Sequence, residues 1–175
     1  MGGKAIQIGN RKIGEDHPVF FIAEAGVNHN GDVDLGKELV AVAKEAGADA
    51  VKVQTFRTEN IIIPSAPKSS YHIETTGAGQ SWFDLLKSQE LSKKDHEILI
   101  EHANHVGIMF LSTPYDTESV DLLVELEIAA FKVASTDANN IPLLRYIASQ
   151  GRPIILSTAM CTLEEVEESV SAIRD

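Results

Sequence analysis

The stretches AVKVQ (residues 50–54) and AFKVAS (residues 130–135) are apolar and strand-like, and each carries one lysine. Side chains alternate along a β-strand, so Lys52 shares a face with Gln54, whereas Lys132 shares a face with alanines. An ammonium group inside a sheet costs several kcal/mol unless it meets an anion. The pattern therefore predicts two cations facing a cavity for a negatively charged small molecule. The alternative is that both lysines lie on edge strands and point into water.

Strand and helix signals alternate around these two stretches. A hairpin is expected within residues 1–15, with Gly9 and Asn10 as its turn. Residues 55–81 are rich in Ser, Thr, Pro and Gly and are expected to form a long functional or mobile loop. Apolar runs predict strands over residues 19–23, 50–54, 108–111, 130–134 and 153–156. Helices are predicted over residues 34–46, 92–106, 118–126 and 141–150, and a fifth begins at Thr162.

Strands that are apolar on both faces and alternate with helices indicate a parallel sheet covered by helices. Two architectures have this form, the open doubly wound sheet and the (β/α)8 TIM barrel. The loop after the first strand lacks the Gly-x-Gly-x-x-Gly fingerprint of the dinucleotide-binding sheet. Polar residues instead follow every strand, which is typical of a barrel: Glu24, Gln54, Ser112-Thr113, Ser135 and Ser157-Thr158.

The barrel also explains the two lysines, because inward side chains at one level come from alternate strands. Lys52 and Lys132 lie on the second and fourth strands, so both can face one cavity. A complete barrel takes about 250 residues, whereas this chain has 175. We therefore interpret residues 1–175 as the first five β/α units and the hairpin of a single barrel domain in a longer protein. The alternative is a half-barrel that pairs with another chain.

Composition narrows the class of protein. The sequence is 43% hydrophobic and 23% charged, as expected of one soluble globular domain. Its formal net charge of −11 argues against nucleic acid or an anionic membrane as partner. The single cysteine, Cys161, excludes an internal disulfide and fits a reducing cytoplasm. No apolar run approaches about 20 residues and no signal pattern opens the chain, so a cytoplasmic location is expected.

Five motifs in order resemble the sialic acid synthase family, in particular its N-acetylneuraminate and legionaminate synthases. They are IAEAGVNHNG (22–31), AGADAVKVQTF (46–56), FLSTPYD (110–116), KVAS with NNIPLL (132–144) and PIILSTAM (153–160). The resemblance implies a cytoplasmic, homodimeric TIM-barrel transferase. Such an enzyme condenses phosphoenolpyruvate with an N-acylated amino sugar of the N-acetylmannosamine type, giving a nine-carbon sialic acid and phosphate.

The resemblance also implies roles for residues at the strand ends. Glu24 and Asp137 would be catalytic, with Glu24 stabilising a cationic intermediate or handling protons. The alternative is that Glu24 merely pairs with a lysine. Asn28 and Gln54 would contact the sugar. Phosphoenolpyruvate would be held by Lys52, Thr113, Lys132, Ser135 and Ser157.

Three departures from the family pattern leave the choice of sugar open. Asp137 stands where many members have glutamate, and Thr136 and Ala159 replace common glycines. Two other readings therefore stay open. One is a related phosphoenolpyruvate-using or aldol-type barrel acting on another sugar, and the other is a non-catalytic truncated paralogue.

The family uses a divalent metal, typically Mn²⁺, to activate the sugar aldehyde. The resemblance places the metal ligands beyond Asp175, and no metal ligand is assigned within this chain. Residues 1–175 alone are therefore expected to lack synthase activity. His29 either lines the site or hydrogen-bonds backbone, and His96 gives no functional signal.

Two expectations concern packing. In the first helix, one face is shared by Leu35, Leu39, Val42 and Ala46. Trp82 and Phe83 are expected to anchor a helix start against the core. The alternative is that the long loop in front of them closes over the sugar.

Overall fold

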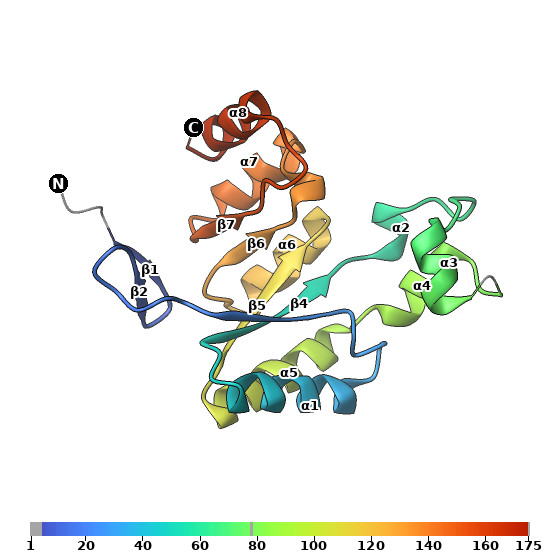
Figure 1. The fold of residues 1–175 in the computed structure, drawn as a ribbon, viewed down its shortest axis with the longest axis horizontal. Helices are drawn as coiled ribbons and strands as arrows, with labels where there is room; N and C mark the ends of the chain where they lie inside the picture. The colour runs from blue at the N-terminus through green and yellow to red at the C-terminus, as the bar shows by residue number, and fades with distance from the viewer. Residues whose placement is uncertain (1–4, 78, 175) are drawn as a thin grey trace.

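Five parallel β-strands form the centre of the molecule and lie side by side in chain order (Figure 1). The computed structural model describes residues 5–77 and 79–174. The strands are β3 (Ile22–Gly26), β4 (Ala50–Thr55), β5 (Met109–Pro114), β6 (Phe131–Val133) and β7 (Ile154–Leu156). An open doubly wound sheet reverses its strand order at a switch point, whereas a barrel adds each strand beside the last. The observed order is that of the predicted barrel.

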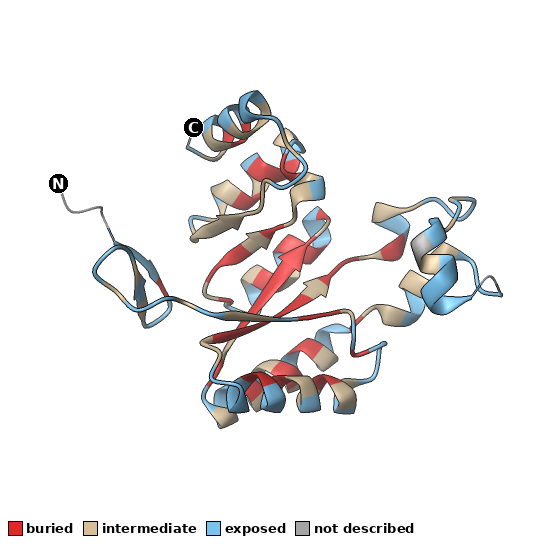
Figure 2. Cartoon of the chain, in the orientation of Figure 1, coloured by how far each residue is buried: buried red, intermediate tan, exposed pale blue. Residues whose placement is uncertain are grey.

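Helices cover one face of this sheet. They are α1 (Val33–Glu45), α5 (Lys93–Val106), α6 (Thr117–Glu125), α7 (Ile141–Ser149) and α8 (Leu163–Arg174). Buried residues follow the strands and the helix faces turned toward them (Figure 2). The main core joins Val51, Val53 and Phe131 of the strands to Leu99 and Leu123 of the helices. Within the described part of the chain, no helix is long and apolar enough to cross a membrane.

A second, smaller core lies on the opposite face of the sheet. The hairpin of β1 (Ile6–Ile8) and β2 (Arg11–Ile13) turns at Gly9, whose φ is +55°, as predicted. Ile8 packs there against Ala50, Leu111 and Ala130, near the start of their strands. Ala50 and Lys52 share a face, so this inner face is apolar at its base and becomes polar toward the strand ends.

The predicted start of the first strand was wrong. β3 begins at Ile22 rather than at residue 19, and Val19 and Phe21 are 70% and 64% exposed. The backbone N–H of Phe21 donates to the Asp49 carboxylate at 2.8 Å, and its carbonyl accepts from the Asp49 N–H at 2.9 Å. At Phe21, the backbone N–H thus bonds to the Asp49 side chain instead of to the backbone of a neighbouring strand.

The predicted face of α1 was partly wrong: Leu39 packs against the core, but Val42 and Ala46 are exposed. The buried residues of α1 are Gly36, Val40 and Ala43, whereas Val42 is 61% exposed. A Cβ on Gly36 would lie 2.9 Å from Leu99 Cδ2 of α5. The absence of a side chain on Gly36 lets the two helices pack closely at this point.

The segment predicted as one long loop contains short helices. α2 (Thr58–Ile61) and α3 (Ser70–Thr76) lie within it, and α4 (Trp82–Gln89) follows. Side chains of Ser69 and Ser81 accept hydrogen bonds from the backbone N–H of His72 and Asp84, which caps α3 and α4. We call α2, α3 and α4 the arm, because they extend away from the sheet beyond the end of β4 (Figure 1).

Two fully buried histidines support the helix layer near the arm. The Nε2 atom of His96 lies 2.8 Å from Thr55 Oγ1, and its Nδ1 lies 2.9 Å from the Ser92 carbonyl oxygen. His29 Nδ1 accepts from the Gly31 N–H at 3.0 Å, so the backbone interpretation of His29 is confirmed. Burial lowers the pKa of both histidines, and His96 lowers the pKa of His29 further.

This pair predicts a pH-dependent stability. Because the folded-state pKa is lowered, the unfolded chain binds protons first as the pH falls below about 6.5. The stabilisation is complete above that value and is lost as the pH falls through the folded-state pKa. We expect urea unfolding to show a falling free energy between about pH 7.5 and about pH 5.5.

Two variants test the assignment. His96→Gln should flatten the pH dependence of the unfolding free energy, whereas the change His105→Gln, at an exposed position of α5, should leave it unaltered. A slope that survives the loss of His96 undiminished would show that this buried imidazole is not its source.

Candidate active site

Two lysines and two hydroxyls gather on the inner face at the ends of four strands. Lys52 of β4 forms an ion pair with Glu24, its register partner on β3, and its Nζ donates to Thr113 Oγ1 at 3.4 Å. Lys132 Nζ of β6 donates to Ser157 Oγ and to the Val133 carbonyl, both at 2.6 Å. We call Lys52, Thr113, Lys132 and Ser157 the lysine cluster.

The two ammonium groups are close enough for the charge of one to affect the pKa of the other. Burial lowers the pKa of Lys132, the charge of Lys52 lowers it further, and Glu24 opposes both effects. The two ammonium groups therefore influence each other, but neither lysine is among the residues that line the cavity of Gln54, Tyr115 and Asp137. Edge positions are excluded, because β4 and β6 each have a strand on both sides and Lys52 is only 7% exposed.

A cavity of about 970 Å³ opens beside the lysine cluster. Part of its lining comes from the ends of β4 and β5 and the turn after β6, through Gln54, Tyr115 and Asp137. We call these three residues the tyrosine wall. Burial raises the pKa of Tyr115 to about 12, and the nearby carboxylates of Asp137 and Glu24 contribute.

Glu24 lies where the lysine cluster meets the tyrosine wall. It pairs with Lys52 on one side and acts electrostatically on Tyr115 on the other. Gly26 keeps this junction open, since a Cβ there would lie 3.2 Å from Glu24 Oε1 and 3.8 Å from Gln54 Nε2. The φ of Gly26 is +57°, a value that also favours glycine. The Glu24 carboxylate can therefore act on a ligand held by the lysine cluster and on one held by the tyrosine wall.

The arm supplies the far side of the cavity. Its apolar lining includes Ile61, Trp82, Leu85 and Leu86, and the Trp82 ring lies edge-on to the His72 ring with centroids 3.8 Å apart. No residue of α4 is buried. The expectation that Trp82 anchors a helix against the core was therefore wrong. Trp82 begins a helix, but its side chain lines the cavity.

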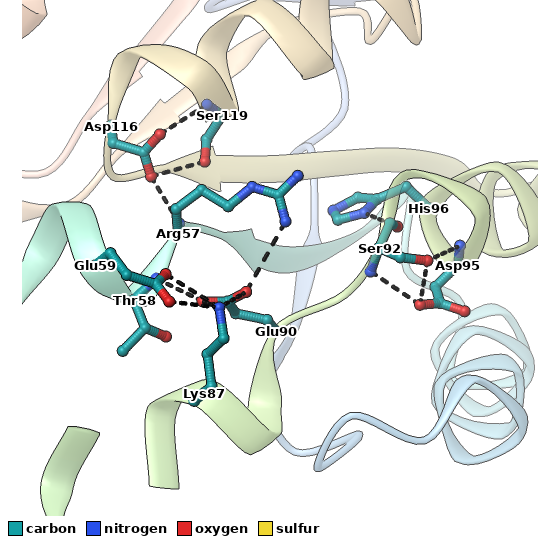
Figure 3. Close-up of polar contacts among 10 residues, drawn as sticks. All are labelled: Arg57, Thr58, Glu59, Lys87, Glu90, Ser92, Asp95, His96, Asp116 and Ser119. Carbon is teal, nitrogen blue, oxygen red and sulfur yellow. Dashed lines mark hydrogen bonds and ion pairs between the residues drawn. The ribbon is translucent and has the colours of Figure 1, made fainter. Parts of the chain in front are cut away.

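A polar network fixes the arm to the strand ends (Figure 3). Asp116 Oδ2 accepts from the Arg57 backbone N–H at 2.8 Å, while Oδ1 caps α6 through the Ser119 N–H at 2.8 Å. Glu90 Oε1 accepts from the Thr58 N–H at 2.5 Å, and Lys87 Nζ lies 3.1 Å from Glu90 Oε2. The start of the arm is thus held by Asp116, which follows β5, and by Glu90, at the end of α4.

This network shifts the ionisation of Glu90. Burial opposes the charged carboxylate, but hydrogen bonds from Thr58 and Lys87 outweigh it and hold the pKa of Glu90 below its usual range. The carboxylate therefore stays charged and keeps its contacts at neutral pH. The sequence analysis missed this residue, because its two partners lie on the arm.

Most predicted site residues are brought together, and some are not. Glu24 and Gln54 lie at the junction, and the lysine cluster holds four of the five residues assigned to phosphoenolpyruvate. Ser135 begins the short 3-10 turn after β6, and its carbonyl lies 3.9 Å from Cys161 Sγ. Asn28 is exposed and does not line the cavity, whereas its neighbour Val27 does.

Sequence reasoning missed two groups of cavity residues. Tyr115 belongs to a quoted motif but was given no role, although its place directly after β5 matches that of the residues that were chosen. The arm residues were hidden inside an assumed loop. The pattern Ser81-x-x-Asp84, in which Ser81 Oγ lies 3.0 Å from the Asp84 N–H, is a helix-start signal that could have revealed α4.

The described residues do not provide a metal site. In ranges 5–77 and 79–174, no group of three or more His, Cys, Asp or Glu side chains could hold a metal ion. The donor set present here does not fit a resident divalent ion, so no step is assigned to one.

Comparisons with known proteins agree with this arrangement. The model described as the NeuB family matches residues 39–175. The chain is 43% identical over 171 residues to the N,N'-diacetyllegionaminic acid synthase of Legionella pneumophila, covering 94% of this chain and 48% of that protein. It is 34% identical to the N-acetylneuraminate-9-phosphate synthase of Homo sapiens, covering 94% and 45%.

A solved structure with the same fold is the N-acetylneuraminic acid synthetase of Leptospira borgpetersenii. It aligns with a TM-score of 0.83 at 34% identity, over 99% of this chain and 56% of that chain. The five β/α units are therefore part of a (β/α)8 barrel, as predicted. The chain spans about half the length of the curated relatives it matches.

Proposed function

The chain belongs to the NeuB family, and on this premise we propose that its protein condenses phosphoenolpyruvate with an N-acylated amino sugar. The products would be a nine-carbon sialic acid and phosphate. The observation that carries this proposal is the lysine cluster, in which two cations from alternate strands share one environment. Such a pair suits a small molecule that has both a phosphate and a carboxylate.

The lysine cluster would hold phosphoenolpyruvate. Lys52 and Lys132 would neutralise its two anionic groups, and Thr113, Ser135 and Ser157 would donate hydrogen bonds through their hydroxyls. Lys52 pairs with Glu24, and Lys132 donates a hydrogen bond to Ser157. Binding of phosphoenolpyruvate would exchange these contacts for contacts with its phosphate and carboxylate.

The acceptor sugar would occupy the neighbouring cavity, against Gln54 and Asp137, with Asn28 at its edge. A new C–C bond would form between the terminal methylene carbon of phosphoenolpyruvate and the sugar carbonyl carbon, while the C=O π bond of the sugar breaks and its oxygen takes a proton. Water would then add to the carbon that bears the phosphate, and phosphate would leave. Glu24, placed at the junction of the two regions, would stabilise the positive charge that develops there or move a proton.

Several properties of the whole protein belong to the same proposal. Residues 1–175 would be the N-terminal portion of a single barrel domain, with residues 1–15 as a hairpin at its base. The whole protein would be a cytoplasmic homodimer. The divalent ion of the whole protein would be Mn²⁺, with its ligands supplied from outside residues 1–175.

The test is phosphate release from phosphoenolpyruvate by the intact natural protein with Mn²⁺ and a panel of sugars. The panel contains N-acetylmannosamine, an amino sugar with two acyl groups, and unacylated aldoses. Turnover with an N-acylated sugar supports the proposal, and the preferred sugar identifies the product. Turnover with unacylated aldoses alone would instead favour the related aldol-type barrel. A folded protein that releases no phosphate with any sugar would favour the non-catalytic paralogue.

A further inference from the structure

On the inner face of the barrel, the positive and the negative side chains lie in two different regions. Both lysines lie in the lysine cluster, whereas the tyrosine wall carries Asp137 and has Glu24 beside it. An anionic ligand is attracted to the first region and repelled by the second. The tyrosine wall therefore suits an uncharged polar ligand.

Tyr115 is held rigidly at the end of β5. Its backbone N–H donates to the Thr55 carbonyl at 3.1 Å. The next residue, Asp116, is fixed by the network that ties the arm to the barrel (Figure 3). The Tyr115 ring meets the Phe56 ring edge-on, with centroids 6.4 Å apart and planes at 81°. Backbone and ring contacts together set the direction of the phenol.

The Tyr115 hydroxyl is available to a ligand. Among residues 5–77 and 79–174 it has no hydrogen-bond partner, and the side chain lines the cavity with Gln54 and Asp137. A phenol keeps its proton at neutral pH even at its ordinary pKa of about 10, and burial raises the pKa of Tyr115 further, to about 12. The cavity is thus lined by an oriented, protonated donor that lies near two carboxylates.

We propose that Tyr115 is a substrate-binding residue whose hydroxyl donates a hydrogen bond to an oxygen of the uncharged acceptor sugar. This inference rests on the proposed function, which it deepens by assigning a donor to the acceptor side. Phosphoenolpyruvate is not the partner, because the carboxylates of Glu24 and Asp137 lie near this hydroxyl. Asp137 would accept from the same sugar, so the wall offers both a donor and an acceptor.

The competing explanation is that Tyr115 is only a spacer that packs against Phe56. Tyr115→Phe separates the two, because it removes the hydroxyl and keeps the ring and its edge-on contact. A matched control is Tyr146→Phe, since Tyr146 is remote from the cavity and its hydroxyl donates to Asp121 at 2.6 Å on the helix surface.

The experiment is calorimetric titration of the intact protein with N-acetylmannosamine and, separately, with phosphoenolpyruvate. Losing one hydrogen bond to an uncharged group should raise the Kd for the sugar about three- to tenfold in Tyr115→Phe. The Kd for phosphoenolpyruvate and the thermal midpoint should match those of the parent protein. Steady-state kinetics should likewise show a raised KM for the sugar and an unchanged KM for phosphoenolpyruvate.

Equal sugar affinity in Tyr115→Phe and the parent protein would overturn the inference. Equal weakening of both ligands would also overturn it, since the hydroxyl would then not be specific to the acceptor. A parent protein that binds no sugar would do the same. Titration does not depend on turnover, so a protein that binds sugar through Tyr115 but releases no phosphate would refute the proposed function alone.

Discussion

Replacing Lys132 with alanine will weaken phosphoenolpyruvate binding by the intact protein sharply. Removing one partner of a hydrogen-bonded charge pair in such a site costs about 2–4 kcal/mol, which corresponds to roughly 30- to 700-fold in Kd. The loss should be large because Lys132 lies on an interior strand and no other lysine than Lys52 belongs to the cluster. Calorimetric titration with phosphoenolpyruvate measures it directly.

The matched control is Lys37→Ala on the outer surface of α1, where Lys37 pairs with Asp34 at 2.5 Å. This variant loses the same charge from the protein but should bind phosphoenolpyruvate normally. If Lys132→Ala also binds normally, the assignment of the lysine cluster to the phosphate and carboxylate is wrong.

Replacing Glu24 with glutamine should lower turnover by roughly 100- to 10,000-fold, the range typical of a positioned acid or base. Phosphoenolpyruvate affinity should be unchanged or higher, because the loss of the carboxylate frees the charge of Lys52. Single-turnover kinetics at saturating substrates measures the first effect, and titration measures the second. The two readouts together distinguish a catalytic carboxylate from a counter-ion.

Glu59→Gln provides the comparison, since Glu59 pairs with Lys87 on the exposed side of the arm at 2.8 Å. Its turnover should equal that of the parent protein. If Glu24→Gln retains full turnover and gains affinity for phosphoenolpyruvate, the carboxylate only balances the charge of Lys52, which is the other interpretation of the sequence.

The sequence was a good guide to the barrel because the barrel depends on local, periodic signals. The lysine-bearing strands stand out by their apolar neighbours, and polar residues follow each strand directly. The face of α1 was partly misread because its contact depends on what is missing, the side chain of Gly36 opposite Leu99. A sequence shows directly where the large apolar residues of a helix lie, but it does not show where a glycine allows a second helix to pack closely.

The arm and the tyrosine wall were beyond the reach of sequence patterns for a different reason. The helices of the arm are short, and their stability comes from caps and from contacts such as Glu90 with Thr58. Tyr115 gains its significance only from Asp137 and Glu24, which lie on other strand ends. Relations among distant residues of this kind appear only in the folded molecule.

The way in which the arm is attached has an evolutionary consequence. The carboxylates of Asp116 and Glu90 accept hydrogen bonds from the backbone N–H groups of Arg57 and Thr58. Every residue except proline has such an N–H group. Substitutions on the cavity side of the arm therefore leave its anchorage intact, and none of them touches the lysine cluster. Under the proposed function, this attachment would allow the residues that face the acceptor sugar to change during evolution while the lysine cluster stays the same.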